Sequence, residues 1–114
     1  MHVDVRKRDD VVILDLTGKL TAGLGDQILR ESIDELLGEG FRKILVNLSG
    51  VGFMDSAGVG ELVSGLRTAR RLGPDLHLLN VTERVQSSLS MARLLPIFTI
   101  HQSEDEAVQG FAQA

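Results

Sequence analysis

The sequence of 114 residues contains no cysteine, no tryptophan and no tyrosine. Without cysteine, the chain has no disulfide, no thiolate nucleophile and no metal site built on sulfur. Aromatic residues make up 4% of the chain, which argues against a stacking platform for bases or sugars. The missing residue types therefore exclude thiol chemistry and argue against a ligand that binds by stacking of a base or a sugar.

The chain also lacks a long apolar run and an excess of positive charge. Its net charge is −4, and Arg67, Arg70 and Arg71 form one short cluster, whereas nucleic-acid binding usually needs an extended basic stripe. No apolar run approaches the length of a membrane span, and residues 1–10 alternate between apolar and charged types, unlike a signal peptide. We therefore expect a cytoplasmic protein that binds neither nucleic acid nor a membrane.

The residues that are present are typical of a globular protein. Hydrophobic residues make up 43% of the chain and charged residues 25%. A chain of this length can bury one hydrophobic core but not two, and it contains no internal repeat and no low-complexity linker. We therefore expect a single domain over residues 1–114.

Apolar patterning predicts a hairpin at the start of the chain. Apolar and charged residues alternate over residues 3–5, and an almost continuous apolar run covers residues 11–16. The polar turn between these two segments indicates a β-hairpin. A glycine-rich connection over residues 17–26 follows, and Asp26 is the expected N-cap of the first helix.

The first helix and the next strand are predicted from their apolar positions. The helix has one apolar side and ends at Gly38 or Gly40. The run over residues 43–48 is nearly all apolar, which is typical of a central strand covered on both faces. The apolar side of the helix consists of Leu29, Ile33, Leu36 and Leu37.

The second half of the chain continues to alternate helices with strands. A second helix ends at Gly73, and strands are expected over residues 76–81 and 97–100. A third helix is capped by Asn80 or Thr82. The apolar sides of these two helices consist of Val59, Leu62, Val63, Leu66 and Ala69, and of Val85, Leu89 and Ala92.

A last helix is predicted at the C-terminal end, and the element order then defines the fold class. Ser103 with Glu106 fits a capping box, and Ala107, Val108 and Phe111 form the apolar side of this helix. The order is β-β-α-β-α-β-α-β-α. Because strand–helix–strand units favour parallel crossovers, we expect an α/β fold with about four helices and a mixed sheet, its antiparallel part supplied by the hairpin.

The segment "GVGFMDSAGVGELV" over residues 50–63 carries the candidate site. It places Asp55 beside Ser56 at the point where a buried strand ends and the second helix begins. Such a junction can hold a nucleophile, a phosphate acceptor or a plain helix cap. Each of these alternatives requires different neighbours.

The neighbours argue against catalysis by Ser56. An esterase nucleophile elbow needs G-x-S-x-G, and here Met54 stands where the first glycine would be. Hydrolysis would also need a histidine as general base. None is suitably placed, because His2 lies at the terminus, His77 within a strand and His101 after the last strand. We therefore expect no catalytic residue, and these histidines to be solvated or satisfied locally.

Two phosphate-related folds are excluded in the same way. A response-regulator receiver needs an acidic pair after its first buried strand to hold Mg²⁺, whereas Asp9 and Asp10 precede that strand here. A Walker phosphate loop needs a further glycine at a fixed distance before Gly18-Lys19 and a threonine directly after the lysine, and this sequence has neither. We therefore expect neither a metal nor a cofactor.

Phosphorylation of Ser56 itself is compatible with the sequence. A phosphate in the first turn of a helix lies beside unpaired N–H groups and the positive end of the helix dipole. Its charge of about −1.5 to −2 would change the surface that a partner meets without breaking the fold. Gly58 and Gly60 are poor helix formers, which suggests that a partner approaches the backbone closely. A simple capping role for this segment remains the alternative.

The segment "ILVNLSGVGFMDSAGVGELV" resembles the signature of STAS domains of the anti-sigma-factor-antagonist (anti-anti-sigma factor) type. The resemblance covers essentially all 114 residues and is strongest over residues 43–60. It implies a STAS fold in which an anti-sigma factor that is also a serine kinase, with a histidine-kinase-like ATPase fold, phosphorylates Ser56. A PP2C-type phosphatase would restore the serine. The unphosphorylated protein would bind the kinase and release a sigma factor.

The resemblance also implies a partner-binding surface around the serine. Its expected members are Asp55, Ser56, Ala57, Gly58, Gly60 and Glu61, the last on the exposed side of the second helix. The sequence departs from the family pattern at Thr21, where many members have aspartate. This departure concerns the identity of the partner. Three alternatives stay open: a STAS scaffold of a signalling assembly, a cytoplasmic STAS subunit of a transport system, and a small serine hydrolase.

Overall fold

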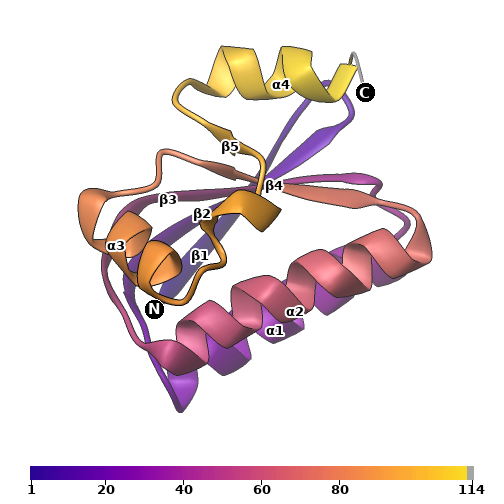
Figure 1. Cartoon of the computed structure of the whole chain (residues 1–114). Coiled ribbons are helices and arrows are strands. Elements are labelled where there is room, and N and C mark those ends of the chain that lie inside the picture. The colour runs from indigo at the N-terminus through magenta and orange to yellow at the C-terminus, as the bar shows by residue number, and fades with distance from the viewer. Residues whose placement is uncertain (113–114) are drawn as a thin grey trace.

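The computed structural model describes residues 1–112, which form a mixed sheet with helices on both faces (Figure 1). The sheet has five strands in the order β1-β2-β3-β4-β5, with β1 antiparallel to β2 and all later neighbours parallel. The predicted element order is confirmed. The strands are β1 (His2–Arg8), β2 (Val11–Leu20), β3 (Lys43–Met54), β4 (Asp75–Leu79) and β5 (Ile100–His101).

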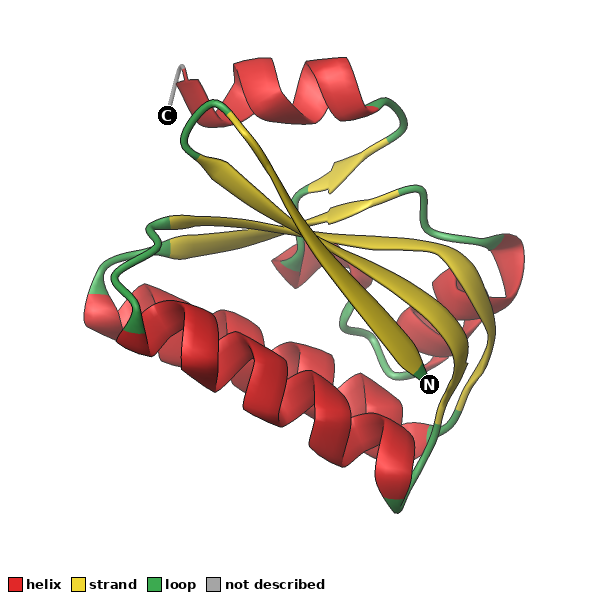
Figure 2. Ribbon diagram, turned by 180° about the vertical axis from the view of Figure 1, so that it is seen from behind, coloured by secondary structure: helices red, strands yellow, loops and turns green. Residues whose placement is uncertain are grey.

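Four α-helices lie within the described residues, and they divide unequally between the two faces of the sheet. Figure 1 and, from behind, Figure 2 show α1, α2 and α3 on one side and α4 alone on the other. This agrees with the predicted number of helices. The helices are α1 (Leu24–Gly38), α2 (Ser56–Leu72), α3 (Glu83–Met91) and α4 (Glu104–Ala112).

Alternation along the strands explains why both faces of the sheet are covered. Because successive side chains of a strand point to opposite faces, Val12 and Leu14 of β2 join the core beneath α1, α2 and α3. Val11 and Ile13 instead join a smaller cluster with Phe111 of α4. The continuous apolar run over residues 11–16 therefore forms a strand buried on both sides, as the sequence predicted.

Two strands extend further than the apolar runs indicated. Residues 17–20 were expected to be a loop, but they continue β2, and β3 runs on to Met54. The pairing of β2 with β3 shifts register between Asp15 and Thr17 and again between Gly18 and Lys19. These irregularities let polar and glycine residues stay in the ladder, because a bulge accommodates an extra residue without ending the strand.

The longer β2 also moves the start of the first helix. α1 begins at Leu24, with Gly23 in the N-cap position and no side-chain cap. The prediction that Asp26 caps this helix is wrong, because Asp26 lies within its first turn and its carboxylate accepts a hydrogen bond from Gln27 N. The helix ends at Gly38, as predicted.

The chain between α3 and α4 also differs from the prediction. Residues 97–100 were expected to be a strand, but Leu95–Ile97 forms a 3₁₀ turn that contains Pro96, and β5 has only Ile100 and His101. Proline removes the N–H that a ladder needs, so pairing begins only where Leu78 N donates to Thr99 O at 2.9 Å. α3 ends at Met91, which leaves Ala92 exposed rather than on the apolar side.

The predicted caps of the later helices are confirmed where side chains reach the first turn. Thr82 Oγ1 accepts from Val85 N at 3.3 Å, so Thr82, rather than Asn80, is the cap of α3. Ser103 Oγ accepts from Glu106 N at 3.3 Å at the start of α4. Gly73 follows α2 with a φ of 107°, a conformation that favours glycine.

Ion pairs fasten the start of α4 to the first hairpin. Arg6 pairs with both Asp15 and Glu104, and Arg8 Nη1 lies 2.8 Å from Glu104 Oε2. The two guanidinium groups lower the pKa of the Glu104 carboxyl to about 2. The antiparallel hairpin therefore supplies the cations that hold the acidic first turn of the last helix.

Candidate functional site

Asp55 fixes the junction between β3 and α2 through both oxygens of its carboxylate. Oδ1 accepts from Gly58 N and Oδ2 accepts from Ala22 N, each at 3.0 Å. Asp55 N in turn donates to Leu20 O at 3.3 Å. These backbone donors hold the pKa of the Asp55 carboxyl below its usual range. Asp55 thus caps α2 and also binds the loop that precedes α1.

Ser56 is the first residue of α2, and its side chain is exposed. Within residues 1–112, its hydroxyl has no hydrogen-bond partner, because the Asp55 carboxylate is directed to Ala22 N and Gly58 N instead. The sequence left open whether this segment only caps α2. The structure shows that Asp55 is the residue that caps the helix. Ser56 is therefore free for another role at the positive end of the helix dipole.

Gly58 is buried against the end of β2. A Cβ built at this position would lie 2.2 Å from Leu20 O and 2.8 Å from Met54 Cγ, so only glycine lets α2 pack so closely on the strand. Packing on β2 thus accounts for a glycine at this position, and the role of Gly58 in close approach by a partner stays a prediction. Gly60 is exposed, and no atom lies within 4 Å of a Cβ built there.

Glu61 also differs from the prediction. Its side chain is only 14% exposed, and Oε1 accepts from Arg30 Nη2 of α1 at 2.7 Å. The expectation that Glu61 lies on the exposed side of the helix is wrong, because the helix turns it toward α1. Ala57, on the neighbouring position of the first turn, is half-buried.

A groove runs along the exposed side of α2 from Ser56. Its first part, of about 540 Å³, lies between the start of α2 and the end of α3. Its second part, of about 570 Å³, continues along α2 to Arg71. Gly60 and Leu94 line both parts, so we treat them as one feature and call it the α2 groove.

The walls of the α2 groove include residues that sequence reasoning did not single out. Met91 is 86% exposed and lines the part nearest Ser56. One signal in the sequence marks Met91: it is an apolar residue that lies outside the apolar stripe formed by Val85 and Leu89. Arg67 and Arg71, noted earlier only as a charge cluster, line the far part.

The histidines lie away from this groove. None of them lines it, whereas a Ser–His hydrolase needs a histidine within hydrogen-bond reach of the serine. His77 Nδ1 lies 3.0 Å from His101 Nε2, and His77 Nε2 lies 3.2 Å from Asp75 Oδ2. These two rings therefore satisfy one another locally, as expected.

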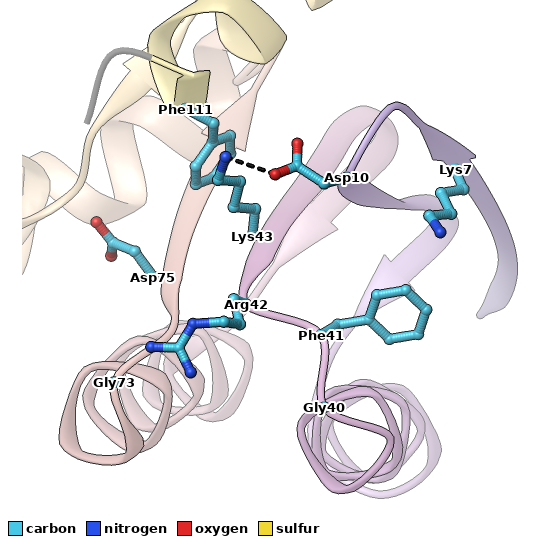
Figure 3. Close-up of a pocket in the computed structure, with 9 residues that line it drawn as sticks. All are labelled: Lys7, Asp10, Gly40, Phe41, Arg42, Lys43, Gly73, Asp75 and Phe111. Atoms are coloured by element: carbon cyan, nitrogen blue, oxygen red, sulfur yellow. Dashed lines mark hydrogen bonds and ion pairs between the residues drawn. The ribbon is translucent and has the colours of Figure 1, made fainter.

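A further depression, of about 420 Å³, lies at the opposite end of the sheet (Figure 3). Lys43 and Asp75 mark the amino ends of β3 and β4 there, and Lys43 Nζ pairs with Asp10 Oδ2 at 2.7 Å. Ser56 instead follows the carboxyl end of β3. The two sites are therefore at opposite ends of the same strand, and this depression is separate from the α2 groove.

The chain belongs to the STAS domain family, because the family model described as the STAS domain matches residues 2–107. The family resemblance, which covers essentially the whole chain and is strongest over residues 43–60, is thus confirmed. In the part of the chain that the structure describes, no helix is long and apolar enough to span a membrane.

Several relatives match over most of their length. A Thermotoga neapolitana protein, whose name assigns it provisionally to the anti-sigma factor antagonists, is 33% identical over 101 residues, 89% of each chain. The anti-sigma-B factor antagonist of Bacillus subtilis is 26% identical over 109 residues, 96% of this chain and 98% of the relative. Each of these is a protein to which this chain is similar.

A solved structure shares the fold. The Bacillus cell fate determinant SpoIIAA in its phosphorylated form superposes with a TM-score of 0.74 at 22% identity, covering 96% of this chain and 99% of SpoIIAA. At this level of identity the likeness establishes the STAS architecture. It agrees with the mixed sheet and helices described above.

Proposed function

We propose that this protein is an anti-sigma factor antagonist whose binding to its partner is controlled by phosphorylation of Ser56. The observation that carries the proposal is the exposed hydroxyl at the first residue of α2, beside a helix cap that does not need it. The names of the Thermotoga and Bacillus relatives support the class of partner.

The chemistry of the proposed switch is an ordinary phosphoryl transfer. A partner serine kinase, with an ATPase fold of the histidine-kinase type, transfers the γ-phosphoryl group of ATP to Ser56 Oγ. ADP leaves and the hydroxyl proton is released. A PP2C-type phosphatase restores the serine by hydrolysis. All catalytic groups belong to the partners, and Ser56 serves only as the acceptor.

The local geometry supports a switch that leaves the fold intact. A phosphate on Ser56 would lie beside the unpaired N–H groups of the first turn, where the helix dipole favours a negative charge by about 0.3–1 kcal/mol. The same dianion would stand at the mouth of the α2 groove, beside the Asp55 carboxylate. A partner packed there would have to desolvate this charge, which weakens binding.

The binding surface that follows from this argument differs in part from the one expected from sequence. Ser56 and Gly60, which line the groove, stay as proposed contact residues, and so does Ala57 beside Ser56. Asp55 acts by holding the turn in place. Gly58 and Glu61 stay in the proposed surface as well: Gly58 packs on β2, and Glu61 forms an ion pair with Arg30 of α1.

The test uses four purified baits against native lysate: wild type, Ser56→Ala, Ser56→Asp and Ser87→Asp. Ser87 is exposed on α3 outside the groove, so its variant adds the same charge as a matched control. We expect wild type, Ser56→Ala and Ser87→Asp to retain one ATPase-fold protein, and Ser56→Asp to lose it.

Mass spectrometry then identifies the acceptor. After incubation with the retained protein, ATP and Mg²⁺, wild type should gain one phosphate on Ser56 and Ser56→Ala none. Equal retention of the partner by all four baits, or a phosphate on another residue, would refute the proposed switch.

A further inference from the structure

The far half of the α2 groove differs in charge from the half that contains Ser56. The near part is lined mainly by apolar residues such as Met54, Val59, Met91 and Leu94, together with the polar residues Asp55, Ser56 and Ser88. The far part contains Arg67 and Arg71, which are both exposed. The groove therefore changes along its length from an apolar end to a basic end, in a protein whose net charge is −4.

These two arginines have no acidic partner among the described residues 1–112. Other cations near the helices do: Arg30 pairs with Glu61, and Arg70 pairs with Asp75. A cation in the last turn of a helix is favoured by the helix dipole, which accounts for Arg70 and Arg71. It does not account for Arg67, which precedes that turn.

The spacing separates the basic end from the proposed phosphate. Arg67 follows Ser56 by eleven helical residues, which corresponds to about 16 Å along the axis. This exceeds the Debye length of about 8 Å at physiological ionic strength. Arg67 is therefore too far along the helix to neutralise a phosphate on Ser56, and its charge is available to another group.

We infer that the α2 groove receives an acidic amphipathic segment of the protein partner. Its apolar side chains pack on Met91 and Leu94 near Ser56, and its carboxylates pair with Arg67 and Arg71. This inference rests on the proposed function, because it names the chemistry of the partner that Ser56 controls. It also places the apolar part of the segment near Ser56 and its acidic part near Arg67 and Arg71.

Charge complementarity is the argument for this occupant. Carboxylates match exposed guanidinium groups in bidentate geometry, and the exposed Met91 supplies an adaptable apolar contact. A basic segment would meet like charges at Arg67 and Arg71. A wholly apolar segment would leave both arginines facing apolar surface.

The experiment uses a defined peptide, so that it does not depend on identifying the natural partner. The probe is a helical peptide with leucines on one face of its first turns and glutamates two turns later on the same face. The matched peptide has lysine in place of each glutamate. Each is titrated into ¹⁵N-labelled protein, and binding is measured from amide chemical shifts.

We expect the glutamate peptide to shift the amides of Gly60, Ser64, Arg67 and Arg71 and to bind at least about tenfold more tightly than the lysine peptide. The Arg67→Glu/Arg71→Glu variant should lose this preference. The Lys7→Glu/Lys19→Glu variant makes the same change of charge outside the groove and should keep it. The preference should shrink at about 0.5 M salt.

Equal binding of the two peptides, or an unchanged preference in the Arg67→Glu/Arg71→Glu variant, would overturn the inference. Tighter binding to vesicles of anionic lipid than to the glutamate peptide would overturn it as well. These outcomes are independent of the bait and mass-spectrometry experiments, because those experiments test the switch at Ser56 with the natural partner and do not use the peptides. A folded spectrum of each variant serves as the control for structure.

Discussion

At the residue scale, a single carboxylate decides the geometry around Ser56. The Asp55 side chain accepts from Gly58 N of its own helix and from Ala22 N of the preceding loop. Because both of its oxygens are used, the cap needs no contribution from the neighbouring hydroxyl. The adjacent acid and hydroxyl of the sequence therefore have separate tasks: one holds the turn and the other is exposed.

The glycines of the first turns of α2 give a prediction at this scale. We expect Gly58→Ala to lower the free energy of unfolding by about 1–3 kcal/mol, because its Cβ would meet Leu20 O at 2.2 Å. Gly60→Ala should be neutral or stabilising by up to about 1 kcal/mol, since alanine favours a helix and the site is open. Urea unfolding of both variants is the measurement.

The pair of variants also separates packing from partner binding. Gly60→Ala stays folded, so any loss of partner retention by this variant reports close approach at the groove. If Gly58→Ala proved as stable as wild type, the tight contact between α2 and the end of β2 would be contradicted.

At the element scale, two histidines connect β4 to the neighbouring strand β5 and to α4. The His77 ring is buried in β4 and stacks on Phe111 of α4 at 3.9 Å between ring centroids. Its Nδ1 faces Nε2 of His101 in β5. When both rings are neutral, one can donate and the other accept. When both are protonated, two N–H groups would face one another.

Burial lowers the pKa of both rings, and their charged neighbours modify this effect. Desolvation is the main cause for His77, opposed by Asp75 and assisted by His101 and Arg70. Desolvation also dominates for His101, opposed by Glu106. Since the unfolded histidines take up protons near pH 6.5, the unfolded state binds more protons than the folded state just below that pH. Stability is therefore lost as the pH falls through this region.

We expect the urea midpoint of wild type to decrease as the pH is lowered from about 7.5 to about 5. The carboxyl groups with lowered pKa, such as Glu104 with a pKa of about 2, stay ionised over this interval. A His77→Gln/His101→Gln variant should show a smaller decrease. His2→Gln, which removes an exposed histidine, should behave as wild type.

Ring chemical shifts provide a second measurement for this prediction, independent of the stability of any variant. In wild type, His77 and His101 should titrate below pH 6.5. If both rings titrated above that value, the sign of the predicted dependence would be reversed and the argument from burial would not hold.

At the scale of the whole molecule, the sheet separates two apolar clusters of unequal size. The larger cluster joins β2, β3 and β4 to α1, α2 and α3, and includes Leu62 at 0% exposure. The smaller joins the other face to α4 through Ala107, Val108 and Phe111. α2, which carries Ser56, thus stands on the larger core, whereas α4 depends on the smaller cluster and on ion pairs.

This division predicts different responses to truncation on the two faces. Leu62→Ala should lower the free energy of global unfolding by about 2–5 kcal/mol and speed hydrogen exchange throughout the sheet. Phe111→Ala should speed exchange mainly in α4 and β5, because these elements open locally before the larger core does. Hydrogen exchange with residue resolution distinguishes the two patterns. Uniform acceleration in both variants would contradict the division.

Much of this architecture was predictable from local patterns. Apolar runs and alternation identified each of the main strands and helices, and Asp55-Ser56 was placed correctly at a strand–helix junction. The predicted element boundaries were wrong where contacts with a distant segment outweighed the local sequence pattern. Residues 17–20 read as a loop but pair with β3 through shifted register, and the pairing energy of a neighbouring strand cannot be seen in one segment alone.

The sequence by itself determined the order of the elements and the position of the serine, because these depend on spacing along the chain. Its resemblance to the STAS signature indicated the family. Only the tertiary structure decided which neighbours of Ser56 face outward. Gly58 packs on β2 and Glu61 forms an ion pair with Arg30 of α1, while Met91, Arg67 and Arg71 border the groove. The physical reason is that exposure depends on which other elements cover a helix, and those elements are distant in sequence.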